Sequence, residues 1–308
     1  MRFPIAYSVR ALFCAGFACL ASLAAAQAGT ATAPAGTEVK SFLWEVTSIT
    51  NRAYLFGTIH AGKREWYPLP RAVEDAFAES EVLAVEADVT DVAAMEKTAG
   101  SMAYKAPDEL MKHVPLVEYE RFREQLPRYG MSLSTMKSLK PFAAASILVF
   151  GEWARLGYLP QFSVDYYLIQ KAKGQKKKVV EVEGVEAQAR LMESLTEEEH
   201  RQTFTGTLDA LDAGLTGEQI EGMVKAWQSG DAFLMLEIAR RYNEKVPGAK
   251  ELEDKFVWSR HKAMLEKVEG YLNKAKERHF IAVGALHLAG PKGLVEQLRA
   301  KGYIVKQR

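Results

Sequence analysis

Two segments near opposite ends of the chain share a pattern that constrains the fold. Residues 54–60 (YLFGTIH) and 281–287 (IAVGALH) both place an apolar run before Gly-x-x-His, and the two histidines lie 227 positions apart. Each run predicts a buried β-strand, and each copy is followed by a glycine and then a helical segment. A glycine at the end of a buried strand lets the backbone turn sharply. We therefore expect His60 and His287 at the carboxyl edge of an open α/β sheet, where ligands bind.

The first 26 residues have the composition of a secretory signal peptide. Arg2 and Arg10 precede an apolar, Ala-rich stretch over residues 11–25, and alanines at positions 24, 26 and 28 form cleavage sites of the A-x-A type. The stretch is too short to span a bilayer comfortably, which favours cleavage over a retained anchor. We therefore expect a periplasmic or secreted protein in which residues 27–38 form a flexible leader and residues 39–308 a single α/β domain.

Removal of this segment would leave a chain without cysteine, because Cys14 and Cys19 both lie inside it. Disulfides, thiolate metal sites and a cysteine nucleophile are then excluded, and any metal must be held by His and carboxylate side chains. The 40 basic and 39 acidic residues of the full chain nearly balance, which gives no electrostatic case for a nucleic-acid partner. We expect a peptide or small-molecule substrate, and no stable membrane span.

The remaining chain predicts an α/β fold with a mixed central sheet and flanking helices. We expect strands over residues 42–48, 53–60, 81–88, 179–182, 279–285 and 303–306, the first two joined as a hairpin. Helices are expected over residues 70–80, 91–104, 116–126, 141–156, 164–173 and 291–301. Helical spacing over residues 186–278 predicts a large block of four or five helices, including a long one over residues 250–276. The C-terminal strand is expected to close the sheet.

Carboxylates follow two of the other predicted strands. Glu86 follows an apolar run, where burial without a partner would be costly. It is either a metal ligand beside His60 and His287 or a strand-end residue that faces solvent or pairs with an arginine. Two imidazoles and one carboxylate with open positions suit Zn, Mn, Co or Fe. Glu183 occupies the turn after the next strand, whereas Arg260, on a predicted helix, is not distinguished by its sequence context.

The remaining histidines lack comparable contexts. We expect surface or structural roles for His113, His200, His261 and His279. The chain contains no G-x-S-x-G, Walker, Rossmann or H-E-x-x-H pattern.

The motifs resemble those of the TraB/PrgY/GumN family, which includes the TIKI metalloproteases. The resemblance runs from about residue 42 to residue 305. It rests on the segments YLFGTIHAG, EVLAVEAD, SVDYYLIQKAKG, VVEVEGVEAQ and VGALHLAGPKGLVEQLRAKGY, of which the last is the most specific. It implies an α/β fold similar to the ChaN-like and erythromycin-esterase-like groups, and metal-dependent peptide hydrolysis that favours Mn or Co.

The resemblance also implies a set of site residues. The residues that match the family's motifs are His60 and His287 for its paired histidines, Glu86 for its acidic residue, Asp165 for its V-D segment, Glu183 and Gln188 for its L-E-x-x-x-x-Q segment, and Arg260 for its E-R-N stretch. In that last stretch, Ser259 and His261 replace the usual Glu and Asn.

Residues and resemblance together predict a metal-dependent hydrolase of the peptidase kind. A divalent Mn, Co or Zn ion would be held by His60, Glu86 and His287. Glu183 would act as general base or orient another side chain, and Arg260 would stabilise the developing oxyanion. Two alternatives stay open. One is a metal-free hydrolase in which a histidine activates water directly, and the other is a non-catalytic protein that sequesters a peptide or signal beneath the helical block.

Overall fold

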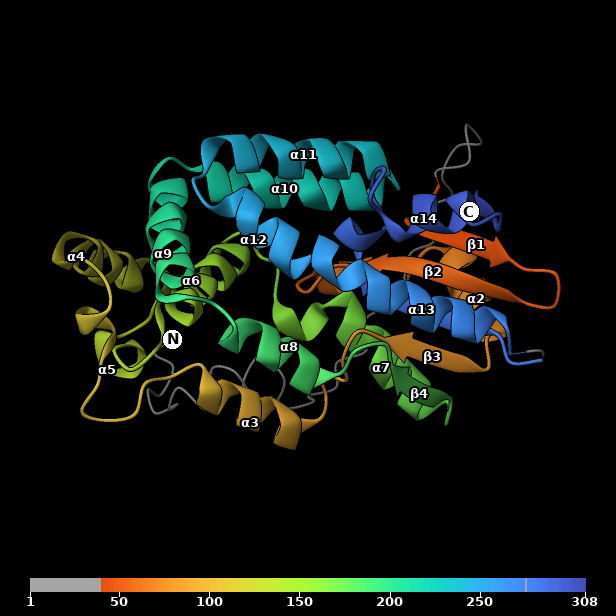
Figure 1. The fold of residues 1–308 in the computed structure, drawn as a ribbon, viewed down its shortest axis with the longest axis horizontal. Helices are drawn as coiled ribbons and strands as arrows, with labels where there is room; N and C mark the ends of the chain where they lie inside the picture. The colour runs from red at the N-terminus through yellow and green to blue at the C-terminus, as the bar shows by residue number, and fades with distance from the viewer. Residues whose placement is uncertain (1–39, 275) are drawn as a thin grey trace.

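The computed structural model describes residues 40–274 and 276–308, so the predicted signal peptide and leader, residues 1–38, lie outside the described residues (Figure 1). Within the described residues, six strands form one sheet in the order β4-β3-β5-β2-β1-β6. The strands are β1 (Leu43–Thr47), β2 (Arg52–Thr58), β3 (Val82–Val85), β4 (Lys178–Glu181), β5 (His279–Gly284) and β6 (Ile304–Gln307). β2, β5, β3 and β4 run parallel, whereas β1 is antiparallel to both β2 and β6. The predicted mixed α/β sheet is confirmed.

The α-helices of the described residues occupy most of the remaining chain. They are α2 (Arg71–Glu79), α3 (Val92–Ser101), α4 (Leu116–Gln125), α5 (Leu133–Met136), α6 (Pro141–Arg155), α7 (Val164–Gly174), α8 (Val185–Glu193), α9 (Glu197–Asp212), α10 (Leu215–Gln228), α11 (Ala232–Lys245), α12 (Ala249–Phe256), α13 (His261–Leu272) and α14 (Leu294–Ala300).

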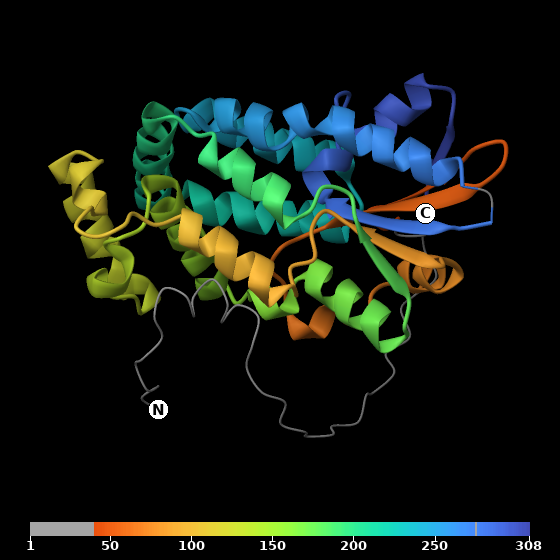
Figure 2. The ribbon, with the colours of Figure 1, turned by 60° about the horizontal axis from the view of Figure 1, so that its bottom comes forward.

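Helices cover both faces of the sheet. α2 and α7 lie on one face, where Phe77 of α2 packs edge-on against Phe280 of β5 at 5.5 Å between ring centroids. α13 lies on the other face (Figure 2). There Tyr271 stacks on His279 with ring centroids 4.3 Å apart. β3 is apolar and buried throughout, and in β5 every residue except Gly284 is buried, as expected for parallel strands covered on both sides.

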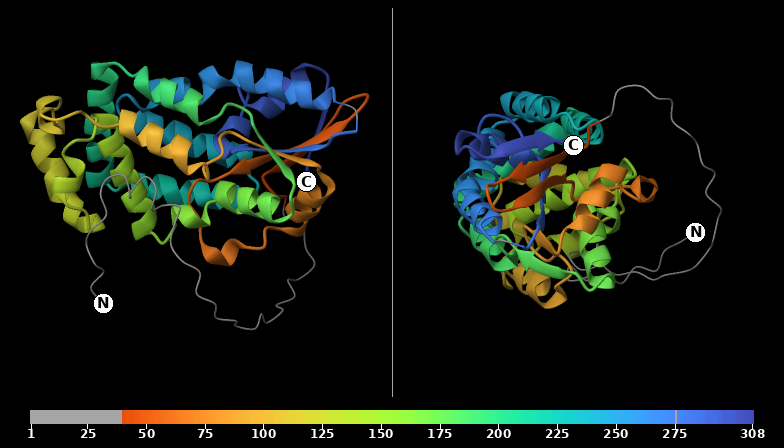
Figure 3. Two further views of the ribbon diagram at one scale, coloured as in Figure 1. Left: turned by 90° about the horizontal axis from the view of Figure 1, so that it is seen from below. Right: turned by 90° about the vertical axis from the view of Figure 1, so that its right-hand side faces the viewer.

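A second group of helices extends beyond the carboxyl ends of the parallel strands (Figure 3). α4, α6 and α9 share a separate hydrophobic core, in which Phe122 and Phe204 are fully buried with ring centroids 5.4 Å apart. α10 and α11 pack side by side along the top of Figure 1. None of the helices within residues 40–274 and 276–308 has the length and apolar character needed to cross a membrane.

The helical block differs from its prediction in two respects. It contains six α-helices among the described residues, α8 to α13, rather than four or five. The long helix expected over residues 250–276 is broken at Val257, whose φ of −117° and ψ of −69° end α12 and start the short 3-10 helix η5 (Trp258–Arg260). Nε1 of Trp258 donates to Glu253 at 2.7 Å and stabilises this break. Apolar spacing continues through the break, which is why the sequence predicted one helix.

Candidate active site

Each of the four parallel strands ends in a segment that carries a predicted site residue. β2 leads to His60, β3 to Glu86, β4 to Glu183 and β5 to His287. Because these strands run in one direction, their carboxyl ends meet at one edge, which faces α8 and α12 (Figure 1). This edge is where open α/β sheets bind ligands.

His60 is held by a buried carboxylate. Its Nδ1 lies 3.0 Å from Oδ2 of Asp165, in the first turn of α7, and Oδ1 of Asp165 accepts a hydrogen bond of 2.8 Å from the hydroxyl of Thr58. Desolvation disfavours the charged ring, but Asp165 outweighs it and raises the pKa of His60 to about 9. The side chain is 64% exposed, so Nε2 is open to a molecule that enters the site.

His287 is buried and neutral. It lies in the short 3-10 helix η6 (Ala285–Leu288) that follows β5. Its Nδ1 is 2.9 Å from Nε2 of His261, and its Nε2 is 3.1 Å from Nη1 of Arg260 and 3.5 Å from Oε1 of Glu86. Burial lowers the pKa of His287 to about 3, so the ring carries no charge at neutral pH.

Glu86 is buried and ionised, and both of its carboxylate oxygens accept hydrogen bonds. Oε1 accepts from the amide of Gly284 at 2.6 Å, and Oε2 accepts from Arg260 at 2.5 Å and from Nε2 of Gln188 at 3.1 Å. Burial raises the pKa of this carboxyl, but Arg260, the nearby histidines and the Gly284 amide outweigh burial and lower it to about 2. Of the readings left open for Glu86, the solvent-facing one is wrong and the arginine pair is confirmed.

Arg260 reaches the site because the predicted long helix is broken beside it. Its guanidinium forms an ion pair with Glu183, and Nε lies 3.0 and 3.1 Å from the two carboxylate oxygens. Nη1 also donates to the carbonyl of Phe256 at 2.8 Å. Burial disfavours the guanidinium charge, but Glu183 and Glu86 raise the pKa of Arg260 above its ordinary value. The contacts of Glu183 favour the orienting role over that of general base.

The two motif glycines are needed for close approach rather than for a sharp turn. Neither Gly57 nor Gly284 has a positive φ, so the conformational reason expected from the sequence is wrong. A Cβ on Gly57 would overlap Cδ1 of Phe42 and lie 3.0 Å from Cα of Ala285, so this glycine lets both the Phe42 ring and the turn that carries His287 pack against β2. A Cβ on Gly284 would lie within 3.8 Å of Glu86, His287 and His60. The absence of that carbon leaves a space between the three side chains.

A cavity of about 190 Å³ opens onto this space. Its polar part is formed by His60, Glu86, Asp165, Gln188 and Arg260. The apolar part is lined by Val89, Leu191, Met192 and Phe256. The cavity is smaller than a typical site for a whole drug-sized ligand, and its size suits a single side chain of a larger molecule.

The predicted ligands match a divalent ion in donor type and ring direction. Both histidines use Nδ1 for hydrogen bonds outside this space, as metal-bound histidines commonly do. Nε2 of His60 borders the space beside Gly284, and Nε2 of His287 lies 3.5 Å from Oε1 of Glu86. As placed, no three His, Cys, Asp or Glu side chains among residues 40–274 and 276–308 form a group that could hold an ion. Arg260 also donates to Nε2 of His287, and an ion at that nitrogen would replace this hydrogen bond.

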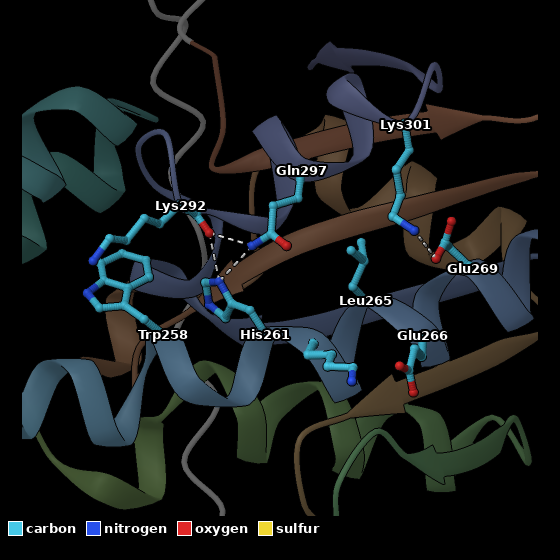
Figure 4. Close-up of a pocket in the computed structure, with 9 residues that line it drawn as sticks. Trp258, His261, Leu265, Glu266, Glu269, Lys292, Gln297 and Lys301 are labelled. Atoms are coloured by element: carbon cyan, nitrogen blue, oxygen red, sulfur yellow. Dashed lines mark hydrogen bonds and ion pairs between the residues drawn. The ribbon is translucent and has the colours of Figure 1, made fainter.

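His261, for which the sequence predicted a surface or structural role, is buried and contacts His287 of the candidate active site. The residue is 3% exposed and forms the inner wall of a second pocket of about 620 Å³. Figure 4 shows its ring directed towards Lys292 and Gln297, with Trp258 beside it. The other side of the ring contacts His287, so His261 separates this outer pocket from the candidate active site. Its position next to Arg260 in the chain was the available signal.

The model of the TraB/PrgY/gumN family matches residues 42–307. The chain belongs to this family. The resemblance inferred from the motifs is therefore confirmed, although no solved structure matches this family member significantly.

Relatives of this TraB/PrgY/gumN family member include bacterial and animal proteins. The uncharacterised protein YbaP of Escherichia coli (strain K12) is 27% identical over 84% of this chain and 93% of its own length. The metalloprotease TIKI homologue of Amphimedon queenslandica is 24% identical over 87% of this chain and 61% of its own length. Metalloprotease TIKI1 of Homo sapiens is 24% identical over 89% of this chain and 63% of its own length. The match thus spans about three fifths of these TIKI proteins.

Proposed function

We propose that the protein is an exported, metal-dependent hydrolase that acts on peptides. The observation that carries this proposal is the convergence of two strand-end histidines on one space. His60 and His287, which follow neighbouring strands, both border the space beside Gly284, and both have Nδ1 engaged outside that space. The name of the TIKI metalloproteases, which are similar over most of this chain, supports the same chemistry.

In this proposal His60, Glu86 and His287 hold the ion. A bound divalent ion supplies a water of lowered pKa and polarises the carbonyl of the substrate. Asp165 orients His60 through Nδ1 and keeps Nε2 directed at the site. Arg260, oriented by Glu183, places a permanent positive charge beside the space where an oxyanion develops.

The cavity indicates which peptides to test. Its apolar part, formed by Val89, Leu191, Met192 and Phe256, lies beside the polar groups. A peptide whose apolar side chain enters this part would place its adjacent amide bond near the polar groups. Transfer of such a side chain from water contributes about 1.5–3 kcal/mol when it is fully buried. Peptides with Leu, Met or Phe next to the bond to be cleaved are therefore the first substrates to screen.

Metal content and ion titration of the purified protein test the proposal directly. Wild type should bind a single Mn²⁺, Co²⁺ or Zn²⁺ ion per chain, and His60→Ala and His287→Ala should both lose it while remaining folded. His113→Ala is the matched control, because His113 lies on the distant helical part and its Nε2 pairs with Asp108 at 2.9 Å. Ion binding that persists in both site variants would contradict the proposed ligands.

The metal-free alternative keeps one specific observation in its favour. Arg260 donates to Nε2 of His287 and to Glu86, so two of the three predicted ion ligands already have a hydrogen-bond donor within the protein. In that mechanism a histidine would activate water directly, and His60, which Asp165 holds protonated, would donate a proton rather than hold an ion. Peptide hydrolysis that survives exhaustive chelation would favour this alternative. Peptide binding without a product at any ion concentration would favour sequestration.

Export is proposed from the sequence of residues 1–26 alone. N-terminal sequencing of the protein recovered from the periplasm or medium should begin near residue 27. Recovery of the intact chain from the cytoplasm would contradict this part of the proposal.

A further inference from the structure

Four polar groups form one continuous line of hydrogen bonds that leads from the outer pocket into the candidate active site. The line runs from the carbonyl of Lys292 to Nδ1 of His261 at 2.8 Å, from Nε2 of His261 to Nδ1 of His287 at 2.9 Å, and from Nε2 of His287 to Nη1 of Arg260 at 3.1 Å. Both rings are at least 96% buried, so the protein, rather than solvent, determines where their hydrogens lie.

The groups at the two ends of this line determine which atom donates and which accepts in each hydrogen bond, and they agree with each other. A guanidinium nitrogen can only donate, so Nε2 of His287 accepts from Arg260 and the hydrogen of the neutral ring lies on Nδ1. A carbonyl oxygen can only accept, so Nδ1 of His261 donates to Lys292 and Nε2 of His261 is left as an acceptor. The hydrogen on His287 and the lone pair on His261 therefore face each other, and each bond has one donor and one acceptor.

We infer that His261 is a positioning residue that holds His287 in its Nδ1–H tautomer, with the Nε2 lone pair directed into the active site. In the opposite tautomer, Nε2–H of His287 would face the N–H of Arg260 and would have only Oε1 of Glu86, 3.5 Å away, on its acceptor side, while its Nδ1 lone pair would face the lone pair of His261. Both contacts would be lost in a buried place, which disfavours that tautomer by more than about tenfold. The catalytic meaning of this arrangement rests on the proposed function, since an ion or a proton acceptor at this position needs that lone pair.

The outer pocket holds His261 in place. Nε2 of Gln297 donates to the carbonyl of Lys292 at 2.6 Å and lies 3.2 Å from Nδ1 of His261, so the amide side chain, the carbonyl and the ring form one cluster (Figure 4). Trp258 packs edge-on against the His261 ring at 5.2 Å between centroids. These contacts restrict rotation of the ring and keep its Nε2 aimed at His287.

Nuclear magnetic resonance of the imidazole nitrogens tests the inference without relying on activity. The chain has six histidines, so the long-range ¹H–¹⁵N spectrum of the ¹⁵N-labelled protein is simple enough to assign, with His287→Gln identifying the His287 signals. The measurement is made at neutral pH after chelation of metal ions. The expected result is a neutral His287 with its hydrogen on Nδ1. A wild-type spectrum with the hydrogen on Nε2 would overturn the inference, whatever the variants do.

Three variants separate positioning from simple support of the fold. His261→Leu removes the acceptor, and the ratio of the Nδ1–H to the Nε2–H tautomer of His287 should fall by about tenfold. His261→Gln places an amide oxygen near the position of Nε2, and it should restore the wild-type tautomer. His279→Gln is the control, because His279 is equally buried but packs on Tyr271 at a distance from the site, and it should leave the His287 signals unchanged.

The outcomes also distinguish this inference from the proposed function. If His287 has the expected tautomer but no variant or wild-type protein binds an ion, the metal-dependent function is wrong and the positioning role stands. If His261→Leu and His261→Gln both retain the wild-type tautomer, the positioning role is wrong even where ions bind. If His261→Gln lowers the tautomer ratio of His287 as much as His261→Leu does, the explanation that His261 acts as a hydrogen-bond acceptor is wrong.

Discussion

Replacement of Gly284 by alanine would fill the space between the three predicted ion ligands. A Cβ at this position would stand 3.3 Å from Oε1 of Glu86, 3.6 Å from Cδ2 of His287 and 3.8 Å from Nε2 of His60. Carbon atoms in contact are about 3.5–4.0 Å from their neighbours, so the methyl group would touch all three side chains and only the contact with Glu86 would be tight. Gly284 has φ −51° and ψ 137°, which alanine adopts without strain.

The expected result is a folded protein that binds ions poorly. The free energy of unfolding should change by less than about 1 kcal/mol, because the tight contact with Glu86 is offset by the smaller entropy of an unfolded chain that contains alanine. The affinity for Mn²⁺ or Co²⁺ should fall at least tenfold, about 1.4 kcal/mol, since the methyl group occupies the space that the three ligands enclose.

Urea unfolding and titration calorimetry measure the two quantities on the same preparation. Gly270→Ala is the matched control, because Gly270 lies in α13 and a Cβ there would meet no heavy atom within 4 Å. This control should gain up to about 1 kcal/mol of stability and bind ions as wild type does. A folded Gly284→Ala protein with wild-type ion affinity would refute the placement of an ion between these three side chains.

Three further predictions concern single contacts. Trp227→Phe removes the buried hydrogen bond of 2.7 Å from Nε1 to the carbonyl of Gly57, and should lower the free energy of unfolding by about 1–2 kcal/mol in urea titrations; an unchanged value would contradict it. Burial lowers the pKa of His279, so the stability that this neutral ring contributes above pH 6.5 is lost on acidification, with a slope of up to about 1.4 kcal/mol per pH unit. His279→Gln should therefore flatten the decline of the urea midpoint between pH 7 and 5. If the urea midpoints of wild type and variant decline equally with pH, burial of His279 is not the cause. Glu183→Gln weakens the ion pair that orients Arg260, and it should reduce peptide turnover by on the order of 100-fold while the ion content is retained. If turnover and bound ion are both lost, Glu183 is instead a ligand of the ion.

Local patterns predicted most secondary structure because the responsible forces act over a few residues. The hairpin of β1 and β2 follows from two apolar runs around a short polar turn, and it is present with Val46 opposite Ala53. The break at Val257 was missed because it depends on a hydrogen bond from Trp258 to Glu253, which the spacing of apolar residues does not predict. The number of helices in the block was underestimated for the same reason.

The candidate site was predicted in part. His60, Glu86 and His287 were found from the strand ends that precede them, and all three lie around Gly284. Arg260 required the family resemblance, because an arginine on a helix has no local mark of burial. His261 was assigned no part in the site, because its role consists of a contact with His287, 26 positions away in the chain.

The sequence by itself determined the α/β class, the family and the residue types at the strand ends, since these depend on periodicity and on motifs read over short windows. Only the tertiary structure decided which of those residues meet. β2 and β5 become neighbours although their histidines are 227 positions apart, and the missing Cβ of Gly57 lets the turn after β5 approach β2. The direction of the hydrogen bonds through His261 was decided in the same way, because a buried ring takes its tautomer from the donors and acceptors that the whole fold places around it.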